Sequence, residues 1–504
     1  MLQAFKTYFQ QHPLRTALFL GLFFRMLAVI FAKGFGWHDD HFLIIEASQS
    51  WVDGFDYNNW LPSATDPTRI PQGHSFFYVG IHYLLLKAMT VCGFTDPQGK
   101  MYVLRFLHAM WSLLIIILGF KITYKRSNLK VASYVGLMFA VLWFMPFMSV
   151  RNLVEYVCIP PLMFATWYLV KNDFKLNAKY ALLTGLMLGI GFSIRFQTLF
   201  FTAGFGIALL ILRTPFKYLL LIALSFAAMV LLSQGLVDYC IWGRPFAEFT
   251  EYVNYNLANA TTYGTNVWHM YFGVLLGMLL PPLSLLIFAG FFKNWKKEPL
   301  LFWPSFIFFA FHTYFPNKQE RFILPVLPFI VILGTIGLYQ MVTQYHWDTK
   351  KWFRGIVWFC LVLNMIALPV LTFSYSKRNR VEAMCYIRAQ KDASMVMIED
   401  SNRDDFLMPP LYYLGKWGSV IGVTKQYPPD SALYAYYHKV EIKDRPNYVV
   451  FMQAENIDAR VDSLRKRFPT LTYMTTVEPS FIDKTLHWLN PLNDNQTSYI
   501  YKIK

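Results

Sequence analysis

The sequence is poor in charge and in cysteine. Charged residues make up only 15% of its 504 positions, whereas 55% are hydrophobic and 18% are aromatic. This balance excludes a disordered chain and lies far from that of an ordinary soluble enzyme. The five cysteines are scattered, without a close pair, a CxxC motif or zinc-ligand spacing, so neither a disulfide scaffold nor a zinc fold is expected. No internal repeat occurs, and the first apolar run is too long for a cleavable signal peptide.

What the sequence has instead is a series of long apolar runs. A helix that spans a bilayer needs about 20 mostly apolar residues. Eleven runs predict eleven spans, at about 14–36, 101–120, 132–150, 156–171, 180–194, 198–212, 216–236, 270–291, 299–315, 322–341 and 355–374. A twelfth run, 75–91, contains His82 and Lys87, and counting it as a span would put the cations of 121–130 outside. Because cations favour the inside, we expect this run to be a helix against the outer face, within an external loop over 37–100.

The net charge of +16 first suggests a nucleic-acid partner, but its distribution indicates membrane topology. With the N-terminus inside, the predicted inner stretches hold seventeen Lys or Arg and three acids, a net charge of +14. These stretches are 1–15, 121–131, 171–179, 213–217, 293–298 and 345–354. The loop 37–74 carries six acids against Arg69 alone, so it belongs outside. We therefore expect no nucleic-acid partner.

The composition changes after residue 374. Charges of both signs become dense, and short apolar runs alternate with polar, turn-rich stretches, which predicts a soluble α/β domain. An odd number of spans places this domain on the outer face. The expected fold is an all-α polytopic membrane protein with a membrane domain over 1–374 and an outer α/β domain over 375–504.

Polar residues that are expensive to place near a membrane gather at the outer ends of the predicted spans. They are Trp37 to His41, Arg151-Asn152 with Glu155, Arg195 with Gln197, Asp238, the loop Tyr263 to His269, and Asn317 to Arg321. No inner loop carries a comparable mixture of acids, amides, histidines and aromatics. The predicted site therefore faces away from nucleotide sugars and ATP, and the sequence indeed contains no GxxxxGK[ST] or GxGxxG motif.

Asp39 and Asp40 are the most suggestive pair. Adjacent carboxylates at a helix start serve as caps in many proteins, because Asp is favoured there. The functional alternative is that one carboxylate acts as a general base while the other orients the acceptor or a histidine. Glu46 follows on the same stretch and either joins the site or is solvated.

Two further segments have both a structural and a functional interpretation. The turn Asn317 to Phe322 either places snorkelling cations at an interface or binds a phosphate through Lys318 and Arg321, and Arg195 has the same two interpretations. Tyr263 to His269 is either part of an aromatic belt or a surface for a sugar, which needs apolar rings and hydrogen-bonding groups together.

Together and in this order, these segments resemble the glycosyltransferase family of the α-mannosyltransferases of asparagine-linked glycan and GPI-anchor assembly, which have the GT-C membrane fold. Trp37-His38-Asp39-Asp40-His41-Phe42-Leu43-Ile44-Ile45-Glu46 is similar to that family's His-Pro-Asp-Glu-x-Phe-Gln-x-x-Glu signature. Arg151-Asn152 with Glu155, and Arg195-Phe196-Gln197, resemble two shorter family segments. Tyr263-Gly264-Thr265-Asn266-Val267-Trp268-His269-Met270-Tyr271 is similar to Tyr-Gly-x-x-Pro-Trp-His-Trp-Tyr, and Asn317-Lys318-Gln319-Glu320-Arg321-Phe322 to His-Lys-Glu-x-Arg-Phe. Asn317 and Gln319 depart from the last motif.

The resemblance implies transfer of a sugar, most simply mannose, from a polyprenyl- or dolichyl-phosphate carrier to a hydroxyl of a glycan or glycolipid, with inversion. Under this resemblance Asp39 is the expected general base, and Asp40 is the second candidate for that role. The expected phosphate ligands are Arg321, Lys318, Arg195 and His269. The expected acceptor or sugar contacts are Glu46, Arg69, Arg151, Glu155, Gln197, Tyr263, Trp268 and Glu320. Because a lipid phosphate is already a good leaving group, this chemistry requires neither a metal nor another cofactor.

Three alternatives stay open at the sequence level. A flippase or transporter of lipid-linked saccharides would also have many spans, although transporters tend to show paired repeats and broken helices near the midplane. A GT-C transferase of another sugar, or a polymerase or ligase of surface glycans, would share the topology. The added outer domain favours a bacterial inner membrane over the endoplasmic reticulum, with the site on the periplasmic or lumenal side.

Overall fold

The computed structural model describes residues 10–426, 445–491, 493 and 495–503. Parts of the predicted inner stretch 1–15 and of the predicted domain 375–504 lie outside these residues. The chain forms two compact units. The helical unit comprises Met1–Val29, Asn59–Ile81 and Leu104–Thr372, and the sheet unit comprises Ile30–Asn58, His82–Val103 and Phe373–Lys504. The division 1–374 and 375–504 stays a prediction, and the compact units add two earlier segments to the C-terminal region.

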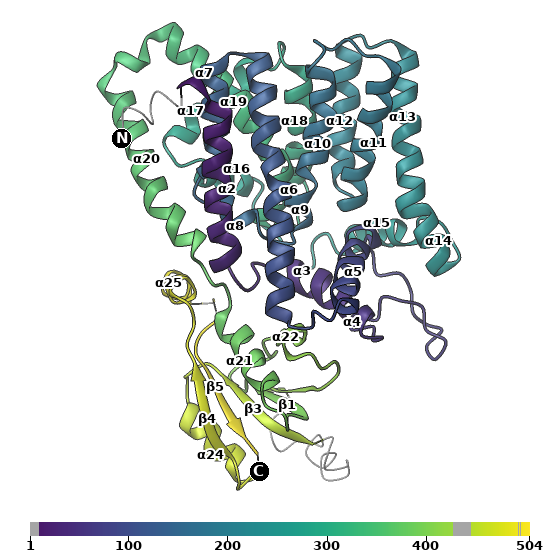
Figure 1. Cartoon of the computed structure of the whole chain (residues 1–504), viewed down its shortest axis with the longest axis vertical. Helices are drawn as coiled ribbons and strands as arrows, with labels where there is room; N and C mark the ends of the chain where they lie inside the picture. Colours follow the sequence, from purple (N-terminus) through teal and green to yellow (C-terminus); the bar gives the residue numbers. More distant parts are fainter. Residues whose placement is uncertain (1–9, 427–444, 492, 494, 504) are drawn as a thin grey trace. The chain divides into compact units, whose positions relative to one another are not determined.

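Every predicted apolar run contains a helix (Figure 1). The helices wholly or mainly within the helical unit are α2 (Pro13–Phe31), α6 (Pro97–Arg126), α7 (Leu129–Val141), α8 (Met145–Met148), α9 (Val154–Val157), α10 (Ile159–Val170), α11 (Ala178–Ile194), α12 (Thr198–Ile211), α13 (Phe216–Val230), η2 (Leu231–Gly235), α14 (Leu236–Trp242), α15 (Ala247–Ala258), α16 (Met270–Met278), α17 (Leu283–Lys293), α18 (Pro299–Tyr314), η3 (Glu320–Val326), α19 (Leu327–Tyr345), η4 (Trp347–Thr349) and α20 (Lys351–Thr372). The twelfth run forms α5 (Phe76–Val91), which passes from this unit into the other. The predicted multi-span helical fold is confirmed.

The described helices that lie in the predicted spans differ widely in length. Five of them are long and apolar enough to cross a membrane by themselves, and α16 with α17, bent by 111° between them, would make a sixth. The remaining apolar runs form helices of fewer than 18 residues, α7, α10, α11 and α12 among them. Short helices in several predicted spans mean that turns and polar side chains lie among the apolar helices.

Close backbone approach holds the centre of the helical unit together. Helix α17 packs on α19, α11 on α13, and α12 on α18. A Cβ added to Gly290 would lie 2.2 Å from the carbonyl oxygen of Gly334, so only glycine permits the α17–α19 crossing. The span containing α19 is 89% buried, whereas that of α20 is only 17% buried. Helix α19 is therefore a core helix, and α20 presents an apolar surface suited to lipid.

The sheet unit contains a mixed five-stranded sheet with the strand order β2-β1-β3-β5-β4. The strands are β1 (Met395–Glu399), β2 (Val420–Val423), β3 (Pro446–Met452), β4 (Thr472–Val477) and β5 (Ser498–Lys502). β1 pairs in parallel with β2 and β3, whereas β5 pairs antiparallel with β3 and β4. The helices that the structure describes within this unit are α3 (His38–His41), η1 (Phe42–Glu46), α4 (Ala47–Val52), α21 (Arg378–Arg388), α22 (Leu411–Leu414), α24 (Ile457–Arg465) and α25 (Phe481–Leu489). The predicted C-terminal α/β region is confirmed.

Within the sheet unit, the residues that follow helix α2 lie beside the residues that follow helix α20. The rings of Phe31 and Phe373 are 4.9 Å apart, and the N–H of Ser376 donates to the carbonyl oxygen of Lys33 at 3.2 Å. The segments that follow these two helices are therefore held together within the sheet unit.

Candidate active site

A buried ionic cluster joins three segments of the helical unit. Oε1 of Glu155 contacts Nη1 of Arg195 at 2.5 Å and Nε of Arg321 at 3.1 Å. Glu155 lies in the short helix α9, Arg195 follows the last residue of α11, and Arg321 lies in η3. All three side chains are buried. The structure thus assembles three of the predicted site residues, and it gives Glu155 the position of a counter-ion to two arginines.

This cluster holds more positive than negative charge. One carboxylate faces two guanidinium groups, and Nε and Nη2 of Arg195 have no hydrogen-bond partner among the described residues. The ring of Phe322 flanks both cations, at 5.0 Å from Arg195 and 5.6 Å from Arg321. A buried donor without a partner costs about 1–3 kcal/mol, so a bound anion that accepted these hydrogen bonds would relieve that cost.

The two motif loops that follow α15 and α18 are fastened to each other. The N–H of Lys318 donates to the carbonyl oxygen of Gly264 at 2.8 Å, and the amide of Asn317 donates to that of Tyr263 at 2.9 Å. Lys318 is buried, and burial lowers the pKa of its ammonium group. Asn317, where the family motif has His, therefore stabilises this junction. The sequence placed these loops at one membrane end without predicting their pairing.

The other predicted sugar and phosphate ligands of the helical unit are spread over its surface and interior. Tyr263, Trp268, His269 and Glu320 are exposed. Gln197 is half-buried, and the guanidinium of buried Arg151 lies over the ring of Phe147 at 4.1 Å. Arg69 donates hydrogen bonds to the side chain of Asn59 and to the carbonyl oxygen of Leu61, so it stabilises the loop in which it lies. Their proposed ligand contacts stay predictions.

In the sheet unit, the two adjacent aspartates have different surroundings. Asp40 is buried, and its two oxygens accept the N–H groups of Gly36 at 3.0 Å and Trp37 at 3.1 Å. Asp39 is half-buried in the first turn of α3. Asp40 therefore caps the start of helix α3 by accepting hydrogen bonds from the backbone of the preceding turn. Asp39 remains the better candidate for contact with a substrate.

Glu46 is fully buried at the end of the π-helical turn η1. Its Oε1 lies 3.1 Å from Nε2 of His41 and accepts the N–H of Tyr412 at 3.1 Å. Burial raises the pKa of Glu46 to about 8 and holds the pKa of His41 well below its usual range. These contacts hold Glu46 against His41 and Tyr412 rather than in solvent, and its predicted contact with the acceptor stays a prediction.

Sequence reasoning missed Glu248, which binds the loop 59–75 of the helical unit. Its Oε2 accepts three consecutive backbone N–H groups, those of Gln72 at 3.1 Å, Gly73 at 2.8 Å and His74 at 3.0 Å. Its Oε1 accepts the indole N–H of Trp242 at 2.7 Å. Nothing in the polar helix α15 distinguishes Glu248 from its neighbours, so no local signal predicts this clamp.

Replacing Glu248 with Gln is expected to destabilise the loop 59–75. The amide keeps only one acceptor oxygen for the two sides of the clamp, so either Trp242 or the three backbone donors lose their partner, at about 1–3 kcal/mol. Hydrogen exchange of the amides of residues 72–74 is the measurement. Glu251→Gln, on the same helix, is the matched control and should leave exchange unchanged. Equal exchange in wild type and Glu248→Gln would contradict the clamp.

The carboxyl group of Glu248 also makes the stability of the fold depend on pH. Burial raises the pKa of Glu248 to about 7 from its usual 4.5. The folded chain then binds this proton more tightly than the unfolded chain, so this group's contribution to stability is largest at acidic pH and falls as the pH rises towards 7. Glu248→Gln should lack that part of the pH dependence.

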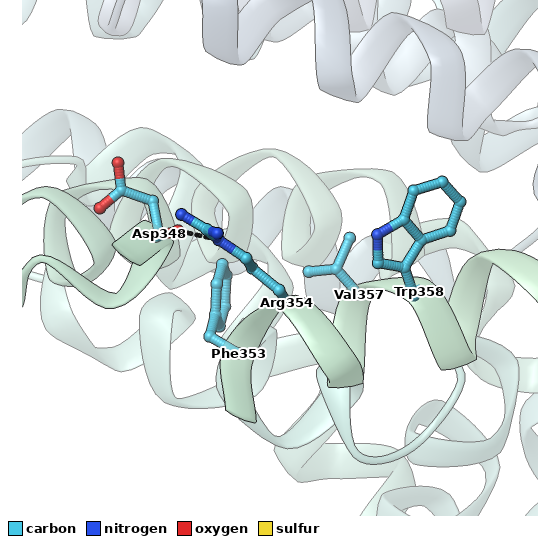
Figure 2. A pocket seen from close by; sticks show the side chains of 5 residues that line it. All are labelled: Asp348, Phe353, Arg354, Val357 and Trp358. Atoms are coloured by element: carbon cyan, nitrogen blue, oxygen red, sulfur yellow. Dashed lines mark hydrogen bonds between the residues drawn. The ribbon is translucent and has the colours of Figure 1, made fainter. Parts of the chain in front are cut away.

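An open hollow lies at the beginning of α20 in the helical unit. It is lined by Asp348, Phe353, Arg354, Val357 and Trp358 (Figure 2). Nε of Arg354 donates to the backbone oxygen of Asp348 at 2.7 Å. No predicted site residue lines this hollow, and its cation is engaged by the chain itself.

Comparison with known proteins decides the family. A model of the Alg9-like mannosyltransferase family matches residues 16–404. The chain belongs to this family. Similar members include mannosyltransferase APTG1 of Arabidopsis thaliana, 23% identical over 74% of this chain and 70% of its own length. GPI mannosyltransferase 3 of Yarrowia lipolytica is 23% identical over 79% of this chain and 74% of its own length.

Solved structures agree on the fold of this Alg9-like protein. ArnT from Cupriavidus metallidurans bound to undecaprenyl phosphate matches with a TM-score of 0.55 at 10% identity, over 98% of both chains. Arabinofuranosyltransferase AftD from mycobacteria matches with a TM-score of 0.51 at 11% identity, over 97% of this chain and 40% of its own. The predicted GT-C fold and the predicted class, a membrane glycosyltransferase of a mannosyltransferase family, are confirmed.

Proposed function

We propose that this Alg9-like protein transfers mannose from a polyprenyl-phosphate carrier to a hydroxyl of a glycan or glycolipid, with inversion. The observation that carries the proposal is the buried cluster of Glu155, Arg195 and Arg321: its excess positive charge, and Nε and Nη2 of Arg195, which have no hydrogen-bond partner among the described residues, suit a phosphate. The lipid phosphate in the ArnT structure of the same fold supports the class of carrier.

The reaction is a single displacement. The acceptor oxygen forms a bond to the anomeric carbon as the bond from that carbon to the phosphate oxygen breaks, and the acceptor proton passes to the carboxylate of Asp39. The departing lipid phosphate keeps the bonding electrons, and Arg195 and Arg321 stabilise its charge, with Lys318 as a third cation. We propose that these side chains suffice without a metal or another cofactor. The positive inner stretches and the acidic loop 37–74 support a reaction on the non-cytoplasmic face.

A donor assay with the full chain in proteoliposomes tests this function. Radiolabelled mannose, glucose and pentose are offered on undecaprenyl and dolichyl phosphate together with a glycolipid acceptor. We expect mannosyl transfer, release of the carrier phosphate, and activity only when the acceptor is supplied on the non-cytoplasmic side. A preference for undecaprenyl phosphate would support a bacterial inner membrane. Transfer of another sugar alone would overturn the choice of mannose, and movement of an intact lipid-linked sugar across the bilayer without transfer would identify a flippase.

A further inference from the structure

Helix α25 of the sheet unit is amphipathic, but it exposes its apolar face, whereas a surface helix of a soluble domain exposes its polar face. Its apolar residues are turned outward: Phe481 is 76% exposed, Trp488 80% and Leu489 65%. At 100° per residue these positions and Ile482 fall on one face, and Asp483, Lys484 and His487 fall on the other. A surface helix usually buries the first face and exposes the second, so this orientation needs an explanation.

The polar face is the one that fastens α25 to the rest of the sheet unit. Asp483 is buried, and its Oδ2 accepts the hydroxyl of Ser480 at 2.9 Å and the backbone N–H of Arg378 at 3.4 Å. Ser480 in turn accepts the N–H of Asp483 as the N-cap of the helix. Hydrogen bonds thus fix which face points outward, and the outward turn of Phe481 and Trp488 is not the result of a loosely attached end.

The attachment point follows closely on the end of a candidate membrane span. Arg378 is only six residues beyond Thr372, the last residue of the span α20. In the same unit, Phe373 packs against Phe31, the last residue of the span α2, and both rings are partly exposed. Helix α25 is therefore hydrogen-bonded to the segment that follows the span α20, five residues beyond Phe373.

We propose that α25 is an interfacial helix whose apolar face inserts into the headgroup region of the lipid bilayer. Trp and Leu on one face are the residues that such helices bury, by about 5–10 Å, and Trp favours this zone of a membrane. Lys484 is the single cation within Phe481–Leu489 and it pairs with Glu478 at 3.1 Å. Apolar burial drives the insertion, so anionic lipid is not required. The anchor holds the C-terminal domain at the membrane surface whatever sugar the protein transfers.

Fluorescence quenching by lipids tests the anchor in the full chain. A fluorophore is attached at Trp488→Cys, and in a matched control at Tyr473→Cys, an exposed position on β4, after the native cysteines have been replaced with Ala. In nanodiscs of purely zwitterionic lipid, a spin-labelled lipid should quench the probe at 488 at least about twofold more than the probe at 473. Adding anionic lipid should leave this ratio unchanged.

Two outcomes overturn the proposal. Equal quenching at both positions would leave the helix in water, and quenching at 488 that appears only in nanodiscs holding two copies would make a second copy the occupant. If the cysteine replacements unfold the chain, hydrogen exchange of residues 481–489 in the unaltered protein replaces the probe. Slower exchange in nanodiscs than in a lipid-free amphipathic polymer supports the anchor, and equal exchange contradicts it.

Discussion

Asp39→Asn is expected to abolish sugar transfer, lowering the turnover by about 10²–10⁴-fold, the usual contribution of a general base. The amide has nearly the shape of the carboxylate but cannot take the acceptor proton. Turnover is measured with a radiolabelled polyprenyl-phosphate donor under saturating acceptor. Binding of the donor, measured separately, should stay close to that of the wild type, because the cations assigned to the phosphate are untouched.

Asp40→Asn separates the two aspartates. Both oxygens of Asp40 accept backbone N–H groups, and the amide retains one acceptor, so this variant should lose about 0.5–2 kcal/mol of stability. Its activity per folded molecule should fall far less than that of Asp39→Asn. Full activity in Asp39→Asn, or a loss confined to Asp40→Asn, would exclude Asp39 as the base.

Local and periodic features could be predicted from the sequence. Every long apolar run forms a helix because a chain in lipid must satisfy its own backbone hydrogen bonds. The mixed composition after residue 374 correctly indicated an α/β region, in which β1 and β3 are short apolar strands. Motif order was enough to identify the family and several polar segments of the candidate site.

Long-range pairing could not be predicted. Glu155 and Arg321 are 166 residues apart, and nothing near Glu155 indicates that it neutralises two arginines. The motif left open whether Glu46 joins the site or is solvated, and its burial against His41 and Tyr412, the latter 366 residues away, could not be predicted. The clamp of Glu248 onto residues 72–74 depends on the path of a loop that no residue periodicity describes.

The largest effect on folding is expected from Glu155→Gln. This change leaves Arg195 and Arg321 buried side by side without a carboxylate, and breaking a buried ion pair from one side costs about 3–5 kcal/mol. The yield of monodisperse protein on size-exclusion chromatography and its thermal midpoint should both fall sharply. Glu320→Gln, next to Arg321 in sequence but exposed, is the matched control and should change stability by less than about 0.5 kcal/mol.

Adding Arg195→Gln to Glu155→Gln tests the reason for that loss. The double variant has the net charge of the wild-type cluster, so it should recover much of the stability, and the two changes should be strongly non-additive. It has one guanidinium fewer for the phosphate, so the KM for the lipid-phosphate donor should rise although the protein folds. A double variant less stable than Glu155→Gln would refute the counter-ion role of Glu155, and a normal KM would remove Arg195 from the proposed phosphate site.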